Sequence, residues 1–292
     1  MKILITGSTG FVGQHLVPKL RDLNFKVIVR SINKEYSNDR QIIYDDENLD
    51  IFKKDVESYN PNIVVHLASY LTSLDDVSSI KNVIDSNILF TSILLESLKS
   101  TDLEFFINTG TFAEYYYNDG KENPAYFYSA SKIAVKPIIK YFKNIQKFKT
   151  INIIPYTIYG GKSKSKKVID YILDSIDSKL YLEMTSGKQI LDFIHIDDVT
   201  DFYVHCLNNI NLLKDEEDYH LGTGKGISIK ELSNIIEKLT NKKAHINWGA
   251  KDYRLLDIMR AIAPIHKLEK ELNWKPQVSI EEGIKKILEE EK

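Results

Sequence analysis

Tyr128 and Lys132, two residues with complementary chemistry, lie four positions apart in the stretch YSASKIAV (residues 128–135). The surrounding residues favour a helix, on which positions i and i+4 share a face. There the Lys132 ammonium is expected to lower the pKa of the Tyr128 phenol from its usual value of about 10 and to hold the ribose of a cofactor. A tyrosine tuned in this way can donate a proton to a carbonyl oxygen as a hydride reaches the carbon.

The same spacing occurs again at Tyr117 and Lys121, so spacing alone does not identify the pair. The chain has 17 Tyr and 39 Lys and Arg residues, all but five of the latter being Lys. Roughly two such matches are therefore expected by chance, and so common a motif needs a structural context. Tyr117 and Lys121 enclose Asn-Asp-Gly, a turn sequence, so no continuous helix aligns them.

A third member of the site should polarise the carbonyl from the end of a neighbouring strand. Thr109 and Thr111 follow the apolar stretch FFIN (residues 105–108) and are the candidates. The alternative is that a threonine here only satisfies backbone groups of the local turn.

Three glycines, Gly7, Gly10 and Gly13, lie between a strand-like run and a helix-like segment at the start of the chain. Glycine is needed where a turn is tight and where backbone approaches a pyrophosphate closely. A helix that starts there offers free N–H groups to phosphates. This position predicts a dinucleotide site, although the spacing G-x-x-G-x-x-G differs from the commonest dehydrogenase pattern.

The second strand, FKVIV (residues 25–29), should end beside the adenosine ribose. A carboxylate there binds the 2′-hydroxyl of NAD, whereas an arginine accommodates the 2′-phosphate of NADP. Arg30 and Ser31 stand at this position, and the next acidic residue is Glu35. We therefore favour NADP(H), the alternative being that Arg30 is an ordinary surface residue.

Apolar β-branched runs alternate with helical patterns through the first two thirds of the chain, which predicts an α/β fold with a Rossmann-type, doubly wound parallel sheet. Pro18 falls inside the first predicted helix, where it should remove one backbone hydrogen bond. Capping-box sequences at Ser228 and Ser279 predict two later helices. We expect a dinucleotide-binding domain (residues 1–160 and 192–226) and a smaller α/β lobe for the substrate (residues 161–191 and 227–292).

Composition excludes several classes of function. The net charge of −2 gives no bias toward nucleic acid or an anionic membrane. No apolar stretch approaches the roughly 20 residues of a membrane span, the start does not resemble a signal peptide, and Cys206 has no partner for a disulfide. The histidines show no metal-binding spacing. We expect a cytoplasmic protein without a metal, in which the basic run at residues 160–168 is a solvated loop.

Four motifs, TGSTGFVG, VVHLAS, NTGTFAEYY and YSASK, resemble the extended short-chain dehydrogenase/reductase family, the NAD-dependent epimerase/dehydratase group. The resemblance covers nearly the whole chain. It implies that Thr111, Tyr128 and Lys132 form the catalytic triad and that Asn87 is the active-site asparagine. It also implies a set of cofactor-binding residues, namely Gly7, Thr9, Gly10, Phe11, Val12, Gly13, Arg30, Ser31, Leu67, Ala68, Ser69 and Asn87, together with Tyr128 and Lys132.

Departures from the family patterns point to one reaction. Dehydratases of the group place Asp-Glu after the catalytic threonine, where this chain has Phe112 and Ala113. The 4-epimerases carry an acidic residue where this chain has Arg30. Both departures favour a ketoreductase that consumes NADPH.

The C-terminal third, with TSGKQILDFIHIDDV, WGAKDYRLLDIM and LNWKP, is similar to nucleotide-sugar 4-ketoreductases of the CDP-abequose and CDP-paratose synthase type. The resemblance implies that Arg254 grips the substrate diphosphate and that Thr157 contacts the substrate. Ile154 and Leu191 replace arginines that are common in relatives, and His195 is interpreted as structural.

The resulting hypothesis is NADPH-dependent reduction of the C4 keto group of a nucleoside-diphosphate 4-keto-(di)deoxyhexose, in deoxysugar synthesis for a surface polysaccharide. The alternatives are a 4-epimerase with retained NAD and a non-catalytic NADP sensor. By analogy with relatives, we expect a homodimer through a four-helix interface.

Overall fold

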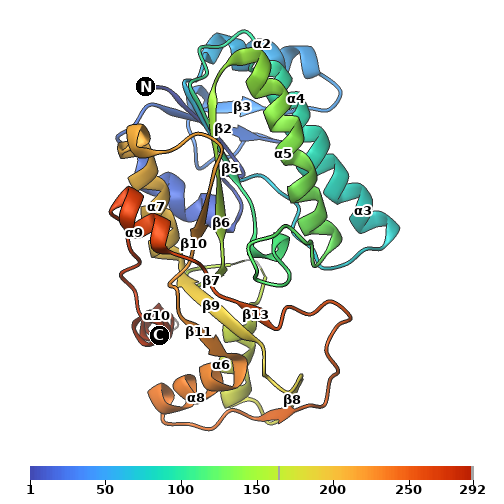
Figure 1. Cartoon of the computed structure of the whole chain (residues 1–292), viewed down its shortest axis with the longest axis vertical. Coiled ribbons are helices and arrows are strands. Elements are labelled where there is room, and N and C mark those ends of the chain that lie inside the picture. Colours follow the sequence, from blue (N-terminus) through green and yellow to red (C-terminus); the bar gives the residue numbers. More distant parts are fainter. Residues whose placement is uncertain (164, 291–292) are drawn as a thin grey trace.

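The computed structural model describes residues 1–163 and 165–290. Lys164 of the basic run and the last two residues of the predicted substrate lobe lie outside these ranges. The described residues form a large sheet covered by helices, with smaller sheets at its lower end in Figure 1.

The large sheet contains seven strands, all parallel, in the order β10-β6-β5-β4-β1-β2-β3. These strands are β1 (Ile3–Thr6), β2 (Phe25–Val29), β3 (Gln41–Ile43), β4 (Ile63–His66), β5 (Phe105–Thr109), β6 (Lys149–Pro155) and β10 (Glu217–Leu221). The central strands are buried on both faces, which explains why their sequences are almost wholly apolar. The predicted Rossmann-type fold is confirmed.

Helices cover both faces of the large sheet (Figure 1). One face packs against α1 (Phe11–Leu16), α7 (Ile196–Asn208) and α9 (His266–Leu272), and the other against α2 (Leu49–Tyr59), α4 (Phe90–Ser97) and α5 (Phe127–Gln146). Successive residues of a strand face opposite sides, so Ile3 and Ile5 enter the first core and Leu4 enters the second. Tyr128 and Lys132 therefore belong to a helix anchored on the second face.

The first helix is shorter than predicted. It ends at Leu16, and a 3-10 turn (Val17–Leu20) follows with Pro18 near its beginning. Proline is tolerated at the start of a helical turn because its missing N–H would have no partner there. Pro18 therefore lies after α1 and does not interrupt it, so the prediction that it falls inside the first helix is wrong.

The run of mostly apolar residues at 151–159 belongs to two sheets. β6 ends at Pro155, and β7 (Thr157–Tyr159) pairs with β9 (Ile190–His195). The Tyr156 N–H between them still bonds to the Leu221 carbonyl, 2.9 Å away, so the chain changes sheets within one residue. This crossing carries the chain from the large sheet to the elements below it.

The lower elements form a third apolar core. β9 also pairs with β11 (Gly226–Ser228) and β13 (Arg260–Ala261), while β8 (Leu182–Met184) pairs with β12 (Ile246–Trp248). α6 (Val168–Asp177), α8 (Ile229–Thr240) and α10 (Ile280–Glu290) pack with these strands. The predicted capping boxes are confirmed at Ser228 and Ser279, which exchange hydrogen bonds with Glu231 and Glu282. The boundaries of the two domains stay a prediction.

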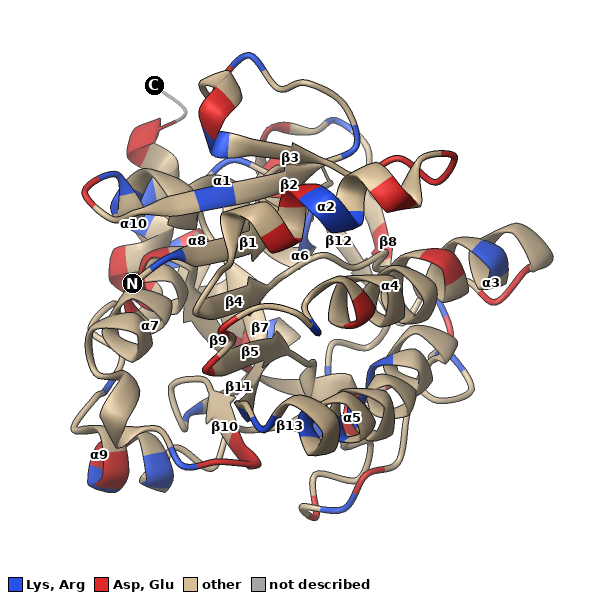
Figure 2. Cartoon of the chain, turned by 90° about the horizontal axis from the view of Figure 1, so that it is seen from above, with Lys and Arg blue, Asp and Glu red and all other residues tan. Residues whose placement is uncertain are grey.

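Figure 2 shows acidic and basic residues interspersed over the helices, as the small net charge suggests. Within residues 1–163 and 165–290, no helix combines the length and apolarity needed to cross a membrane. The same residues contain no cluster of three or more His, Cys, Asp or Glu side chains suited to a metal ion.

Candidate active site

The glycine loop between β1 and α1 packs tightly against the end of β4. Gly7 has a φ of +70°, and a Cβ there would lie 2.6 Å from the backbone nitrogen of Ala68. A Cβ on Gly13 would lie 2.1 Å from the Gly7 carbonyl oxygen. Both positions therefore require glycine. Thr9 and Gly10 are exposed between them and are free to meet a ligand.

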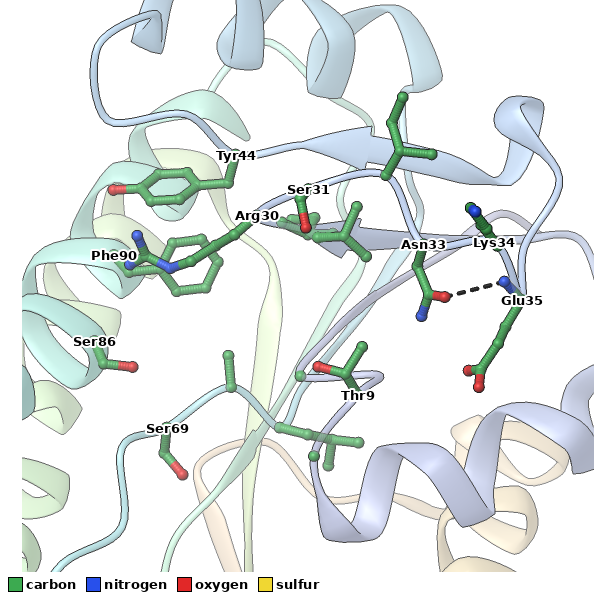
Figure 3. A pocket seen from close by; sticks show the side chains of 17 residues that line it. Thr9, Arg30, Ser31, Asn33, Lys34, Glu35, Tyr44, Ser69, Ser86 and Phe90 are labelled. Carbon is green, nitrogen blue, oxygen red and sulfur yellow. Dashed lines mark hydrogen bonds between the residues drawn. The ribbon is translucent and has the colours of Figure 1, made fainter. Parts of the chain in front are cut away.

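The glycine loop borders a cavity of about 820 Å³ at the carboxyl ends of β1, β2, β3 and β4 (Figure 3). Ligands of open α/β sheets bind at this edge, and the volume suits a nucleotide moiety. Of the residues predicted to bind the cofactor, it is lined by Gly7, Thr9, Gly10, Arg30, Ser31, Leu67, Ala68 and Ser69. Phe11, Val12 and Gly13 follow in the first turn of α1.

Several lining residues were not predicted, and Tyr44 and Phe90 are the largest of them. They come from the residue after β3 and the start of α4, so only the tertiary fold brings them beside Arg30 (Figure 3). The Arg30 guanidinium lies 5.3 Å from the centre of the Tyr44 ring. Its Nη1 lies 3.0 Å from Asp46 Oδ2, with both side chains about 60% exposed (63% and 60%). An ion pair this exposed is weak and can exchange for a ligand phosphate.

Tyr128 and Lys132 lie on one face of α5 and are buried, at 6% and 3% exposure. Tyr117, in contrast, is 67% exposed in a turn after a 3-10 segment. The structure thus separates the two pairs of equal spacing as predicted from their local sequences.

The expected direction of the Tyr128 pKa is wrong in this structure. Burial raises the pKa of the phenol well above its usual value; the Ser69 hydroxyl opposes this and Glu114 adds to it. Burial also lowers the pKa of Lys132 to about 8, against the opposing effect of Glu114. Lys132 is not among the groups that shift the pKa of Tyr128, and its own ammonium is penalised by burial. Tyr128 is therefore protonated at neutral pH, as a proton donor must be before it acts.

Thr109 and Thr111 have different surroundings. The Thr109 hydroxyl bonds to the Tyr203 hydroxyl of α7, 2.6 Å away, which occupies it in a structural contact. Thr111 instead begins the 3-10 turn Phe112–Glu114, and its hydroxyl accepts a long bond, 3.3 Å, from the Ala113 N–H. Thr111 is therefore the better candidate for a hydroxyl that acts on a substrate.

A buried carboxylate that was not predicted, Glu114, lies behind Thr111. It accepts a hydrogen bond from the Thr111 N–H at 2.7 Å and is fully buried. Its other oxygen lies 2.7 Å from Nζ of Lys136, one helical turn beyond Lys132 on α5. The sequence Thr111-Phe-Ala-Glu114 matches a capping box, the same signal that identified Ser228 and Ser279, and could have revealed it.

The Glu114–Lys136 pair belongs to a larger polar network. Lys136 also meets Glu122 at 2.7 Å and Asp218 at 3.5 Å, and Asp218 accepts from the Tyr115 hydroxyl at 2.6 Å. Burial lowers the pKa of Lys136, but Glu114 and Asp218 more than reverse this, so its pKa is raised. Burial raises the pKa of Glu114, opposed by Lys136. The network ties α5 to β10 and to the turn that carries Thr111.

Asn87 is placed by an irregular helix. Between α3 (Val77–Val83) and α4, residues Ile84–Leu89 form a π-helical turn, a feature frequent at functional sites. The buried Asn87 amide donates to Ser131 Oγ at 2.9 Å and accepts from the Tyr70 N–H at 2.7 Å. It thus joins α5 to the segment after β4 rather than lining the cavity itself.

The two predicted substrate residues lie on different elements. Thr157 is the first residue of β7, and its buried Oγ1 has no hydrogen-bond partner among the described residues. Arg254 is exposed between β12 and β13 and, together with Asp257, acts electrostatically on Tyr126, the residue that precedes α5. The structure does not show these two side chains in contact with Tyr128.

Two further predictions concern residues outside this group. His195 caps α7 through its ring nitrogen, which accepts from the Asp197 N–H at 3.2 Å, in agreement with a structural role.

The basic run at residues 160–168 is only partly a solvated loop. Nζ of Lys167 lies 3.1 Å from the centre of the Phe11 ring and bonds to the Ile158 carbonyl, and burial lowers its pKa to about 7. Lys164 of the run lies outside the described residues.

Known proteins share both the sequence and the fold. A sequence model of the NAD dependent epimerase/dehydratase family matches residues 3–222. A CDP-abequose synthase of Salmonella muenchen is 31% identical, covering 98% of this chain and 97% of its own. A putative UDP-glucose 4-epimerase of Methanocaldococcus jannaschii is 28% identical, covering 98% of this chain and 97% of its own.

Among solved structures, the UDP-glucose 4-epimerase of Thermotoga maritima, crystallised with UDP-glucose, has a TM-score of 0.82. It is 23% identical to this chain, and the match covers 99% of this chain and 98% of that one. At this identity the likeness shows the fold alone.

Proposed function

The chain belongs to the NAD dependent epimerase/dehydratase family, and from that premise we propose that it reduces the C4 keto group of a nucleoside-diphosphate 4-keto-(di)deoxyhexose with NADPH. The observation that carries this proposal is the end of β2, where Arg30 and Ser31 line the nucleotide cavity. An arginine there suits the 2′-phosphate of NADP rather than the ribose hydroxyls of NAD. The likeness to a CDP-abequose synthase supports a nucleotide-linked sugar as substrate.

We place the cofactor in the cavity described above, where the glycine loop, packed against the end of β4 through Gly7, presents the exposed Thr9 and Gly10. Arg30, Ser31 and the glycine loop would hold its adenosine half, and the segment from Leu67 to Ser69 forms the opposite wall. When bound, NADPH supplies the hydride.

The residues of the chain supply the proton and orient the C4 carbonyl of the substrate. Tyr128, whose pKa is raised by burial, stays protonated until it donates to the C4 oxygen. Lys132, whose pKa burial lowers to about 8, would hold the ribose of the cofactor and return a proton to Tyr128. Thr111 would hold the carbonyl oxygen, with its backbone fixed by Glu114.

Recognition of the sugar nucleotide is assigned to the lower elements. The exposed Arg254 would pair with the diphosphate, since a guanidinium fork matches phosphate oxygens. The buried Thr157 hydroxyl, which lacks a partner among the described residues, would meet the substrate. The product would then enter the synthesis of a surface polysaccharide.

We also propose that the protein forms a homodimer through the helical segment at residues 86–99 and α5. Large apolar side chains are exposed on both, namely Leu89, Tyr141 and Ile145, at 47%, 60% and 50%. Exposed apolar side chains that gather on one surface mark an interaction site. Light scattering of the purified protein should give twice the mass of the chain.

A second candidate is a nucleotide-sugar 4-epimerase that retains NAD, favoured by the 28% identity with a putative UDP-glucose 4-epimerase. It requires tightly bound cofactor in the purified protein and no net use of NADPH. A non-catalytic NADP sensor has no need of a buried tyrosine and lysine on one helix face.

The test is NADPH oxidation by the purified protein with 4-keto-6-deoxysugars on CDP, dTDP, UDP and GDP, beginning with CDP. Tyr128→Phe is the variant, and Tyr117→Phe, at the exposed pair of equal spacing, is the matched control. Stoichiometric oxidation with one carrier, lost only in Tyr128→Phe, would establish the reductase. Interconversion of unreduced sugars without oxidation would instead favour the epimerase, and full function of Tyr128→Phe would favour the sensor.

A further inference from the structure

A second cavity, of about 880 Å³, adjoins the nucleotide cavity. The two share three lining residues, Thr9, Asn33 and Glu35, which form the wall between them. The second cavity extends from this wall along α1 toward the loop before β3 and is not used by the proposed reaction.

Its lining carries an excess of positive charge. Arg21, Arg40 and Lys162 line it, against a single acidic lining residue, Glu35, on the shared wall. Neither arginine forms an ion pair with a carboxylate of the described residues, in contrast to Arg30 with Asp46. The chain has only five Arg among its 39 Lys and Arg residues, yet three of the five line the two adjoining cavities. Arginine rather than lysine is the residue suited to bidentate contact with phosphate.

The walls of this cavity are held by hydrogen bonds and packing. The Asn33 N–H bonds to the Gln41 side chain at 2.7 Å, and the Gln41 amide bonds back to the Tyr36 carbonyl at 2.9 Å, closing the loop into a compact wall. The Arg40 guanidinium lies 4.7 Å from the centre of the Phe25 ring, which orients it. A guanidinium that is already ordered loses less entropy when it binds.

The opposite wall comes from the basic loop. The Gln14 side chain bonds to the Lys162 carbonyl, and His15, bonded to the Phe11 carbonyl at 2.8 Å, packs against Gly161. These contacts hold Lys162 against α1, far along the chain from the arginines. The cavity is thus assembled by three separate segments of the fold.

We propose that this second cavity is a phosphate-binding site in which Arg21, Arg40 and Lys162 hold a phosphomonoester. The phosphate has two sources that the experiment must distinguish: the 2′-phosphate of the cofactor, which would then reach past Thr9 and Asn33 and lie on the three cations instead of on Arg30, or a separate phosphorylated molecule beside the cofactor, which leaves the 2′-phosphate on Arg30 as proposed above. The first source rests on the proposed use of NADP(H), whereas the second does not.

Calorimetry of the full chain with three probes distinguishes the sources. If the phosphate is that of the cofactor, 2′,5′-ADP binds at least about tenfold more tightly than 5′-AMP, and Arg40→Gln and Arg21→Gln each remove most of this difference. If the phosphate is separate, inorganic phosphate binds to protein already saturated with NADPH, and the same substitutions abolish that binding. Arg260→Gln, on β13, is the charge-matched control. It should retain whichever of the two the wild type shows, the preference for 2′,5′-ADP or the binding of inorganic phosphate.

Thermal unfolding of each variant checks its fold, and the exposed Arg21 provides a variant that does not disturb the Phe25 contact. The proposal would be overturned if Arg21→Gln and Arg40→Gln both kept the wild-type ratio of affinities for 2′,5′-ADP and 5′-AMP, and if inorganic phosphate did not bind to the protein saturated with NADPH. A protein that fails to bind NADPH but binds inorganic phosphate through Arg40 would refute the proposed cofactor and leave this site standing.

Discussion

Glu114 and Lys136 form an ion pair of 2.7 Å whose side chains are 0% and 15% exposed. Through this pair, one carboxylate connects the turn that carries Thr111 with the helix that carries Tyr128 and Lys132. The charges that act on Lys132 and the geometry of Thr111 therefore depend on the same buried group.

Removing the charge of Glu114 should be costly. We expect Glu114→Gln to lower the free energy of unfolding by about 3 kcal/mol, because a buried cation loses its main partner. The double variant Glu114→Gln/Lys136→Met should recover part of this loss. Lys140→Met, on the exposed side of the same helix, should cost at most about 1 kcal/mol. Urea denaturation measures all four proteins, and equal costs for Glu114→Gln and Lys140→Met would contradict this account.

The depressed pKa of Lys132 predicts a pH-dependent stability. In the folded protein the lysine loses its proton near pH 8, whereas the unfolded chain keeps it to about pH 10.5. Between these values the unfolded state binds more protons, so the contribution of Lys132 to the free energy of unfolding rises with pH. Below pH 8 the buried ammonium lowers stability by an amount on the order of 3 kcal/mol.

Lys132→Met should therefore be more stable than the wild type at pH 7, and the difference should shrink as the pH rises from 8 to 10.5. Denaturation in the absence of nucleotide across this range measures the difference, with Lys140→Met as the control for the loss of a lysine. A difference that stays constant with pH would show that the ammonium is not penalised by burial.

The glycine loop offers a graded steric test. A Cβ at residue 13 would lie 2.1 Å from the Gly7 carbonyl oxygen, whereas one at residue 10 would lie 3.1 Å from it. We expect Gly13→Ala to lower the free energy of unfolding by about 1–3 kcal/mol, the usual cost of overpacking, and Gly10→Ala to cost less. Thermal unfolding of the two variants gives the order of their stabilities. A Gly10→Ala protein less stable than Gly13→Ala would mean that the loop is not packed as described.

Strong local patterns made much of this fold predictable. The glycines after β1 determine the local backbone conformation, and so do the turn residues between Tyr117 and Lys121. Their effect could therefore be interpreted without tertiary information. The change of sheet at Tyr156 could not be predicted, because no glycine or turn sequence interrupts residues 151–159 and only the pairing partners of the two halves differ. Edge strand β3, three residues long, gave too weak a pattern to detect.

The site was predictable to a similar degree. Tyr128, Lys132 and Thr111 follow from motifs, but the effect of burial on the pKa of Tyr128 depends on neighbours from other elements. The pairing of Glu114 with Lys136 joins residues 22 positions apart in the sequence, and neither one alone indicates it.

Arg30 provides the decisive test of cofactor preference. Its exposed pair with Asp46 is weak, so a 2′-phosphate, with more charge and more acceptor oxygens, should displace the carboxylate. Arg30→Gln should weaken NADPH binding about tenfold or more and leave NADH binding nearly unchanged. Asp46→Asn should have the opposite effect, because it frees the guanidinium from its competitor. Fluorescence titrations of the wild type and of both variants with NADPH and NADH measure these affinities. Equal weakening of NADPH and NADH binding by Arg30→Gln would show that this residue supports the cavity wall and does not select the cofactor.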